Sequence, residues 1–174
     1  MPTTDGAAAL AVLEALREAG LDHAVLHGAE LLDQPGGLSD VDIVVARSPE
    51  SVLAAARPAL RRHGLFPVVL WPYDIGGSST VFLVDESARS GVQLDMLHDP
   101  RGLGRYRIRS GDLVSAGTPG EASPPLVDPD RLVYLWVKRR SKGQDGRLGE
   151  VAAALRALGP AAVGEAARRL LTRD

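Results

Sequence analysis

The chain has 174 residues, of which 45% are apolar, so it can form one globular domain or one domain with a small helical appendage. Its formal net charge of −2 gives no general basic field that would attract nucleic acid or a membrane surface. The lack of cysteine excludes disulfides, thiol nucleophiles and thiolate metal sites. No apolar run approaches the length of a membrane span, and the N-terminus lacks the basic region of a signal peptide. We therefore expect a soluble, cytoplasmic protein.

The N-terminal half of the chain combines helical and extended patterns. A helical stripe predicts a first helix over 4–20. Short apolar runs predict strands at 23–27 and 41–46. Ser48 then caps a second helix, which Pro58 is expected to kink or interrupt. The stripe of the first helix is made of Ala8, Leu10, Leu13, Leu16 and Ala19.

The second half contains a run of strands followed by helices. The predicted elements are strands at 65–71, 80–85, 91–97 and 105–109, and helices that start near 128, 147 and 161. This order predicts an α/β (α+β) fold, in which a mixed β-sheet carries packed helices and a C-terminal helical cap. We divide the chain into a core at 1–114, a linker at 115–127 and a helical region at 128–174.

Two aspartates near the second strand are the first indication of a site. Residues i and i+2 of a strand point to the same face, so Asp40 and Asp42 lie side by side. The intervening and following residues, Val41, Ile43 and Val45, point the other way into a core. Neighbouring carboxylates repel each other and destabilise the fold unless a proton or a cation lies between them. A hard divalent cation is the natural partner for these oxygen ligands.

A third acid occurs in the strand at 91–97, where Asp95 alternates with apolar residues. If this strand lies beside the second strand, three carboxylates converge. Three carboxylates can hold two Mg²⁺ ions about 3.5–4 Å apart, the arrangement used for in-line phosphoryl displacement. Asp74, Asp85 and Asp99 compete for the third position, but Asp95 is the acid that lies in mid-strand, between Leu94 and Met96.

The chain has the turn Gly28-Ala29, then Asp40-Val41-Asp42 after a gap of ten residues, and then a later strand aspartate. Together these features resemble the nucleotidyltransferase superfamily related to DNA polymerase beta. The resemblance covers about residues 22–97. Small members of that family include aminoglycoside nucleotidyltransferases and the minimal nucleotidyltransferases of toxin–antitoxin pairs. The resemblance implies a polymerase beta-like enzyme that uses two Mg²⁺ ions and an NTP such as ATP. Such an enzyme transfers a nucleoside monophosphate to a hydroxyl of a small molecule or protein and releases pyrophosphate.

The resemblance also implies roles for individual residues. Asp40 and Asp42 bind both metals, while Asp95 binds the catalytic metal and helps to deprotonate the acceptor. Gly28 lets the backbone approach the triphosphate, because it has no Cβ. Ala29 departs from the usual Gly or Ser, and it cannot donate a hydroxyl to a phosphate as Ser would.

Ser39, Lys138 and Lys142 complete the set of residues expected to contact the nucleotide. The two lysines close a helix, where positive charge is also stabilised by the helix dipole. The departure at Ala29 favours an alternative function, a weakly active or inactive module that binds a nucleotide or a partner protein. Nucleic-acid substrates are not expected, because no basic surface interleaved with aromatic residues is evident. A homodimer is left open.

The aromatic residues and the arginine-rich segment can each be interpreted in two ways, as structural or as ligand-binding residues. Trp71, Tyr73 and Trp136 are expected as core or rim residues rather than stacking platforms, although Tyr73 lies in a loop and could stack. The alternating arginines of 105–109 either bind an anion or protect a solvated edge strand with their charge. The sequence does not decide between these readings.

Overall fold

The computed structural model describes residues 6–27, 40–72, 77–87, 89–99, 106–116 and 129–173. The helices are α1 (Gly6–Glu18), α2 (Pro49–Arg62), α3 (Ser110–Ala116), α4 (Pro129–Ser141), α5 (Leu148–Leu158) and α6 (Pro160–Leu170), with a 3-10 turn η2 (Asp145–Arg147). The strands are β1 (His23–His27), β2 (Val41–Val45), β3 (Leu65–Pro72), β4 (Ser79–Asp85), β5 (Gly91–Leu97), β6 (Tyr106–Ile108) and β7 (Leu171–Arg173). None of the described helices combines the length and apolarity that crossing a membrane requires.

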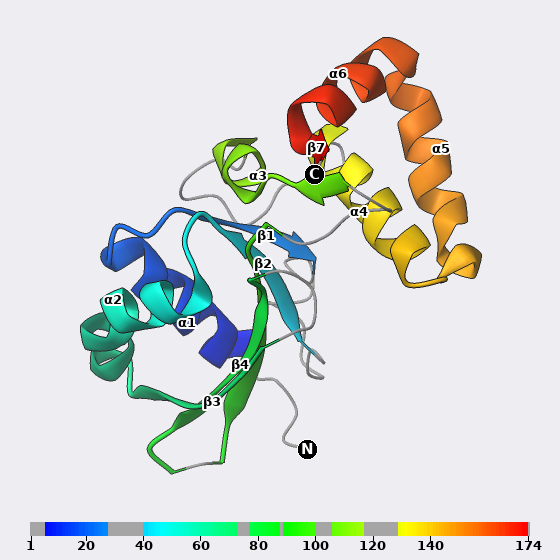
Figure 1. The fold of residues 1–174 in the computed structure, drawn as a ribbon. Coiled ribbons are helices and arrows are strands. Elements are labelled where there is room, and N and C mark those ends of the chain that lie inside the picture. Colours follow the sequence, from blue (N-terminus) through cyan, green and yellow to red (C-terminus); the bar gives the residue numbers. More distant parts are fainter. Residues whose placement is uncertain are drawn as a thin grey trace.

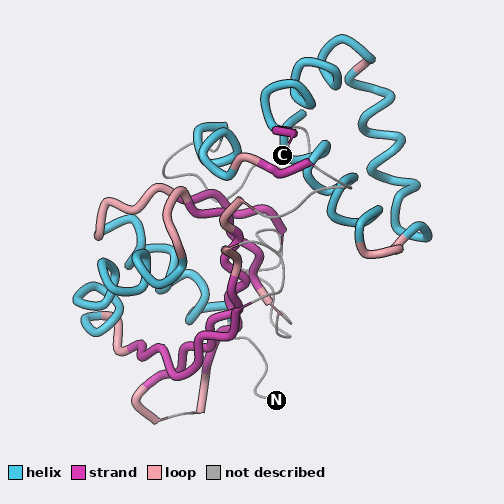
Figure 2. Tube along the Cα trace, in the orientation of Figure 1, coloured by secondary structure: helices cyan, strands magenta, loops and turns pink. Residues whose placement is uncertain are grey.

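Five strands form the main sheet, in the spatial order β1-β2-β5-β4-β3. The strands are drawn in magenta in Figure 2. β2 and β5 run parallel, whereas the β1–β2, β4–β5 and β3–β4 pairs are antiparallel. The predicted mixed sheet is therefore confirmed. The chain leaves β2, passes through α2, β3 and β4, and returns to place β5 beside β2. This return brings together two strands that are far apart in the sequence.

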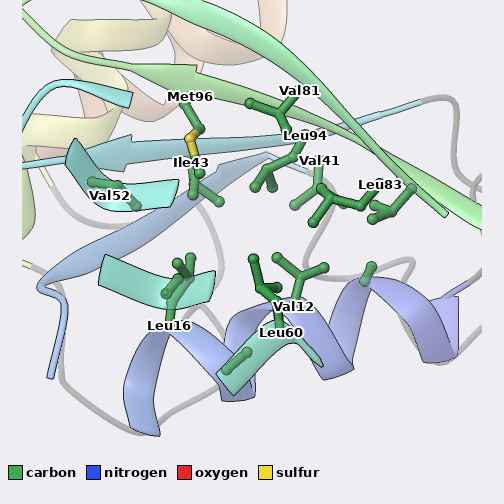
Figure 3. Close-up of a cluster of buried hydrophobic side chains, with 14 of the residues drawn as sticks. Val12, Leu16, Val41, Ile43, Val52, Leu60, Val81, Leu83, Leu94 and Met96 are labelled. Atoms are coloured by element: carbon green, nitrogen blue, oxygen red, sulfur yellow. The ribbon is translucent and has the colours of Figure 1, made fainter. Parts of the chain in front are cut away.

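One face of the sheet packs on α1 and α2 (Figure 1). Figure 3 shows Ile43, Leu94 and Met96 of the sheet directed toward Val12 of α1 and Leu60 of α2. All five of these side chains are buried. Because neighbouring strand residues alternate between faces, the residues on either side of Ile43 and Leu94 point away from this core. The alternation predicted for the second strand is confirmed on this face.

The C-terminal helices pack on the opposite face, over the β1–β2 end of the sheet (Figure 1). Val44 of β2 and Leu97 of β5 join a second hydrophobic cluster with Leu113 of α3 and Leu132 of α4. The cluster continues into α5 and α6. It therefore contains residues from both sides of the predicted linker at 115–127, so the two regions share one core.

Two features at the edge of the helical region were not predicted. The chain forms α3 from Ser110 onward, and α3 extends into the start of the predicted linker. β6, predicted as a short edge strand, pairs with β7, a strand that directly follows α6 and has no counterpart among the predicted elements. This pairing joins segments more than 60 residues apart in the sequence, so local sequence patterns do not predict it.

The start of α2 follows local rules, and the predicted stripe of α1 is confirmed except at Leu10. Ser48 Oγ accepts a hydrogen bond from the Ser51 N–H at 3.3 Å, which confirms the predicted cap. α2 continues through Pro58 without interruption. Leu10, predicted to be inside, is 41% exposed. The predicted Leu13 and Ala19 pack against the core, and the buried residues of α1 are Ala8, Ala9, Val12, Ala15 and Leu16.

A polar cluster ties the end of β5 to α3. Asp99 Oδ1 accepts hydrogen bonds from the N–H and the hydroxyl of Ser110, both at 2.8 Å. His98 Nδ1 lies 3.2 Å from the carbonyl oxygen of Val45, at the end of β2. Asp99 has φ of 41°, in the left-handed region that Asp and Asn tolerate better than other non-glycine residues. Burial raises the pKa of Asp99, but the hydrogen bonds from Ser110 outweigh burial and hold that pKa below 3.8.

We predict that Asp99→Asn lowers the free energy of unfolding at neutral pH by about 1 kcal/mol, because a charged acceptor is replaced by a neutral one. Asn keeps the left-handed backbone and an acceptor oxygen. A depressed folded-state pKa stabilises the fold above the unfolded pKa, and this contribution is lost as the pH falls through the folded pKa. The difference between variant and wild type should therefore shrink below pH 3.8. Urea unfolding at neutral and acidic pH measures it.

The control for this experiment is Asp22→Asn, at an exposed position. It should leave the free energy of unfolding nearly unchanged at both pH values. A difference between Asp99→Asn and wild type that stays constant down to the lowest pH would show that the charge of Asp99 is not what stabilises this joint.

Candidate functional site

Two of the predicted acids lie directly beside each other in the sheet. In the parallel β2–β5 pair, Asp42 is the register partner of Asp95. Neighbouring strands lie about 4.8 Å apart, and register partners point to the same face. Asp42 is 7% exposed and Asp95 is 8% exposed. The fold therefore holds two carboxylates close together on the sheet face that packs on the C-terminal helices.

Asp40 lies directly before β2 and is half-buried. Its position two residues before Asp42 fits the predicted shared face. Among the described side chains, however, no group of three or more His, Asp or Glu residues is arranged to hold a metal ion. The three-carboxylate metal site therefore stays a prediction.

A lysine from the C-terminal helices meets the pair of acids. Lys138 Nζ lies 2.8 Å from Asp42 Oδ1, with 20% of the lysine side chain and 8% of the aspartate side chain exposed. The same ammonium lies 5.8 Å from the centre of the Tyr134 ring, one helical turn earlier in α4. Tyr134 is itself buried in the second hydrophobic cluster. The packing of α4 thus fixes where this positive charge stands.

Asp95 also has a hydrogen-bond donor from the neighbouring strand. Thr80 of β4 is the register partner of Asp95, and Thr80 Oγ1 donates to Asp95 Oδ1 at 2.8 Å. Thr80 is buried as well. A hydroxyl that donates to a buried carboxylate stabilises its ionised form and orients it.

Thr80 was not recognised from the sequence, because its place opposite Asp95 follows only from the register of the β4–β5 hairpin. Asp85 and Ser90 close the β4–β5 hairpin, since the Asp85 N–H donates to the Ser90 carbonyl oxygen. Once this closing pair is known, counting back along both strands places Thr80 opposite Asp95. Threonine opposite a strand aspartate is a side-chain pair able to form a hydrogen bond.

These residues fit a divalent cation by the chemistry of their donors. Two adjacent buried carboxylates supply hard oxygen ligands and negative charge, as Mg²⁺ requires. Lys138 already places a positive charge against Asp42.

The other predicted site residues are less informative. Gly28, Ala29 and Ser39 lie outside the described residues. Lys142 is exposed at the end of α4, where its N–H donates to the Lys138 carbonyl oxygen. No described contact brings the Lys142 side chain to the acids.

The competing third acids take other positions. Asp85 accepts hydrogen bonds from the hydroxyls of Ser87 and Ser90 at the hairpin end of β4. Asp99 binds Ser110, as described above. Asp74 lies outside the described residues. Of the competing acids that the structure describes, Asp95 is the one paired with Asp42.

A scan against protein-family models and a search of the curated proteins each found no match to this chain.

We predict that Lys138→Met lowers the free energy of unfolding, because the partly buried carboxylate of Asp42 loses its cation. The loss should lie near the lower end of the range of about 3–5 kcal/mol that follows when one partner of a buried ion pair is removed. In an Asp42→Asn background the same substitution should cost much less, since the charge it neutralises is gone. Urea unfolding at neutral pH measures all four members of this cycle. Lys142→Met is the matched control directly after the same helix and should change stability by no more than about 0.5 kcal/mol. Equal losses for the two lysine variants would contradict a role for the ion pair.

We predict that Thr80→Val lowers the free energy of unfolding by about 1.5–3 kcal/mol, because a buried carboxylate loses a donor while the side-chain volume is kept. Thr80→Ser keeps the hydroxyl and should recover most of this loss. Urea unfolding compares the two variants. If Ser destabilised as much as Val, the lost methyl packing rather than the hydrogen bond would explain the effect.

Proposed function

We propose that the chain is a Mg²⁺-dependent nucleotidyltransferase that moves a nucleoside monophosphate from an NTP to a hydroxyl of a small molecule or protein. The observation that carries the proposal is the register of Asp42 with Asp95, two buried carboxylates side by side in a parallel strand pair. A fold that needs only stability would not retain this pair, because apolar residues at both positions would avoid the repulsion. Lys138 adds a positive charge at the end of the pair where phosphates would bind.

In the proposed reaction the acceptor oxygen attacks the α-phosphorus of the NTP. The bond from the α-phosphorus to its bridging oxygen breaks, and pyrophosphate leaves with the bonding electrons. Asp95, oriented by Thr80, takes up the proton of the hydroxyl. Lys138 neutralises negative charge on the departing phosphates. Mg²⁺ held by Asp40, Asp42 and Asp95 would lower the pKa of the acceptor hydroxyl and offset phosphate charge.

The alternative is a nucleotidyltransferase-like module that binds a nucleotide or a partner protein without turnover. The Lys138–Asp42 ion pair favours it, because an ammonium at 2.8 Å neutralises Asp42 without any metal. Ala29 favours it too, since the turn lacks a side-chain donor for a phosphate. Dependence of nucleotide binding on Mg²⁺ separates the two candidates.

We predict that Mg²⁺ together with at least one of the four common NTPs raises the melting temperature of the wild-type protein, while the NTP alone does not. A ligand at one hundred times its dissociation constant stabilises the fold by about 2.7 kcal/mol. Asp42→Asn should abolish the shift, because it removes a metal ligand. Glu50→Gln, which removes an exposed carboxylate from α2, is the matched control and should keep it. Differential scanning fluorimetry gives the measurement.

Lys138→Met adds a further distinction to the same experiment. If Lys138 competes with a cation at Asp42, this variant should gain more stability from Mg²⁺ alone than the wild type does. It should gain less from Mg²⁺ with NTP, because a phosphate contact is lost. A nucleotide shift that needs no Mg²⁺ would support the binding module, and no shift with any NTP would rule out both candidates as nucleotide-binding proteins.

A further inference from the structure

The acid pair belongs to a line of residues that crosses four strands. Trp71 of β3 is the register partner of Thr80, Thr80 is the partner of Asp95, and Asp95 is the partner of Asp42. Register partners point to the same face of a sheet, and the hydrogen bond between Thr80 and Asp95 agrees with this. The indole of Trp71 therefore stands on the face of the two carboxylates. Two strand spacings, or about 10 Å, separate Trp71 from Asp95.

A second line beside the first is largely apolar. Val69 is the register partner of Phe82, and Phe82 is the partner of Gln93. Val69 is 44% exposed and Trp71 is 67% exposed, the largest exposed fraction among the large apolar side chains of the described chain. Phe82 and Gln93 are partly exposed. Trp71 is thus not a core residue. We call Val69, Trp71 and Phe82 the aromatic surface.

No described helix covers the aromatic surface. α1 and α2 pack on the opposite face of the sheet, and their hydrophobic cluster includes Val81 and Leu83, the alternate residues of β4. The second cluster takes its sheet residues from β1, β2 and the end of β5, and no described residue of β3 or β4 belongs to it. Figure 1 shows β3 at the end of the sheet remote from α4–α6. Packing within the described chain therefore does not account for an exposed indole at this position.

The chemistry of the surface limits what can bind there. Between Asp95 and Trp71 the described side chains on this face are Thr80, Phe82 and Val69, and none of them is charged. An indole face with apolar neighbours favours a flat ring over a charged or flexible group. Positive and negative groups are concentrated at the other end of the line, at Lys138 and Asp42. One end of the line thus suits phosphates, and the other suits an uncharged ring.

We infer that the aromatic surface binds a flat, uncharged ring carried by the molecule whose hydroxyl is placed at Asp95. The inference rests on the proposed function, which sets the orientation of the ligand along the line of residues. With the triphosphate toward Lys138 and Asp42, the Trp71 end is left for the acceptor. The nucleobase of the NTP has the same ring chemistry, so the experiment has separate arms for the two sources.

Tryptophan fluorescence tests the inference without any turnover. The chain has two tryptophans, so Trp136→Phe leaves Trp71 as the sole tryptophan reporter. The probes are tripolyphosphate with Mg²⁺, the four NTPs with Mg²⁺, the four nucleosides, and phenyl β-glucoside as a neutral ring-bearing alcohol. Ring-bearing probes should quench Trp71, while tripolyphosphate, which has no ring, should leave its emission unchanged.

The matched control moves the tryptophan to another exposed apolar position. Leu10 is exposed on α1, which packs on the opposite face of the sheet, so Leu10→Trp combined with Trp71→Phe and Trp136→Phe reports non-specific quenching. A stacking platform should reach half-quenching at a concentration at least about fivefold lower than the control does. If every ring-bearing probe quenches Trp71 and the control tryptophan at similar concentrations, the inference is overturned.

Two further comparisons identify the ring and separate this inference from the proposed function. Specific quenching by phenyl β-glucoside supports an acceptor ring, and specific quenching by NTPs alone supports a nucleobase. Trp71→Ala should keep the thermal shift produced by Mg²⁺ with tripolyphosphate, because the phosphates bind at the other end of the line. If the wild type shows that shift but no specific quenching, the inference fails and the proposed function stands. Specific quenching without any Mg²⁺-dependent shift would support the ring site and count against the proposed function.

Discussion

The structure depends on how it neutralises two carboxylates that its own strand pairing forces together. Parallel register between β2 and β5 leaves Asp42 and Asp95 adjacent and almost fully buried. Buried carboxylates are tolerated only with donors or cations beside them. The Thr80 hydroxyl and the Lys138 ammonium meet this requirement from β4 and α4. Since Lys138 follows Asp42 by 96 positions, the site exists only when the sheet and the C-terminal helices are packed together.

This requirement explains why the two faces of the sheet differ. The face against α1 and α2 carries a large hydrophobic cluster, in which Ile43 and Met96 are fully buried. The other face is divided along the strand order. Its β1–β2 end packs on the C-terminal helices, its centre carries the carboxylates, and its β3–β4 end exposes the aromatic surface. The described C-terminal helices pack over one end of this face, and Trp71 at the other end is exposed.

Local patterns predicted what depends on local geometry. Alternation placed Asp42 and Asp95 opposite the apolar core residues, and cap rules placed the start of α2 at Ser48. That β2 and β5 are neighbours in the sheet was an assumption at the level of sequence, because the pairing and register of distant strands depend on tertiary structure. The choice of Lys138 rather than Lys142 depends on how α4 rotates against the sheet, and the β6–β7 pair depends on closing a long stretch of chain. Within the predicted stripe of α1 only Leu10 was placed wrongly, and Ala9, Val12 and Ala15 are buried as well.

The aromatic surface and the acid pair have one property in common, which is that both lower the stability of the fold. Stability alone favours an apolar pair at the positions of Asp42 and Asp95 and a polar residue at Trp71. The chain has the reverse at both places, and register puts all three residues on one line across the sheet. Departures from the most stable choice are expected where binding or catalysis constrains the sequence. Because the two departures share one line and one face, the ligand site proposed above would account for both of them, with charge at the α4 end and a ring platform at the β3 end.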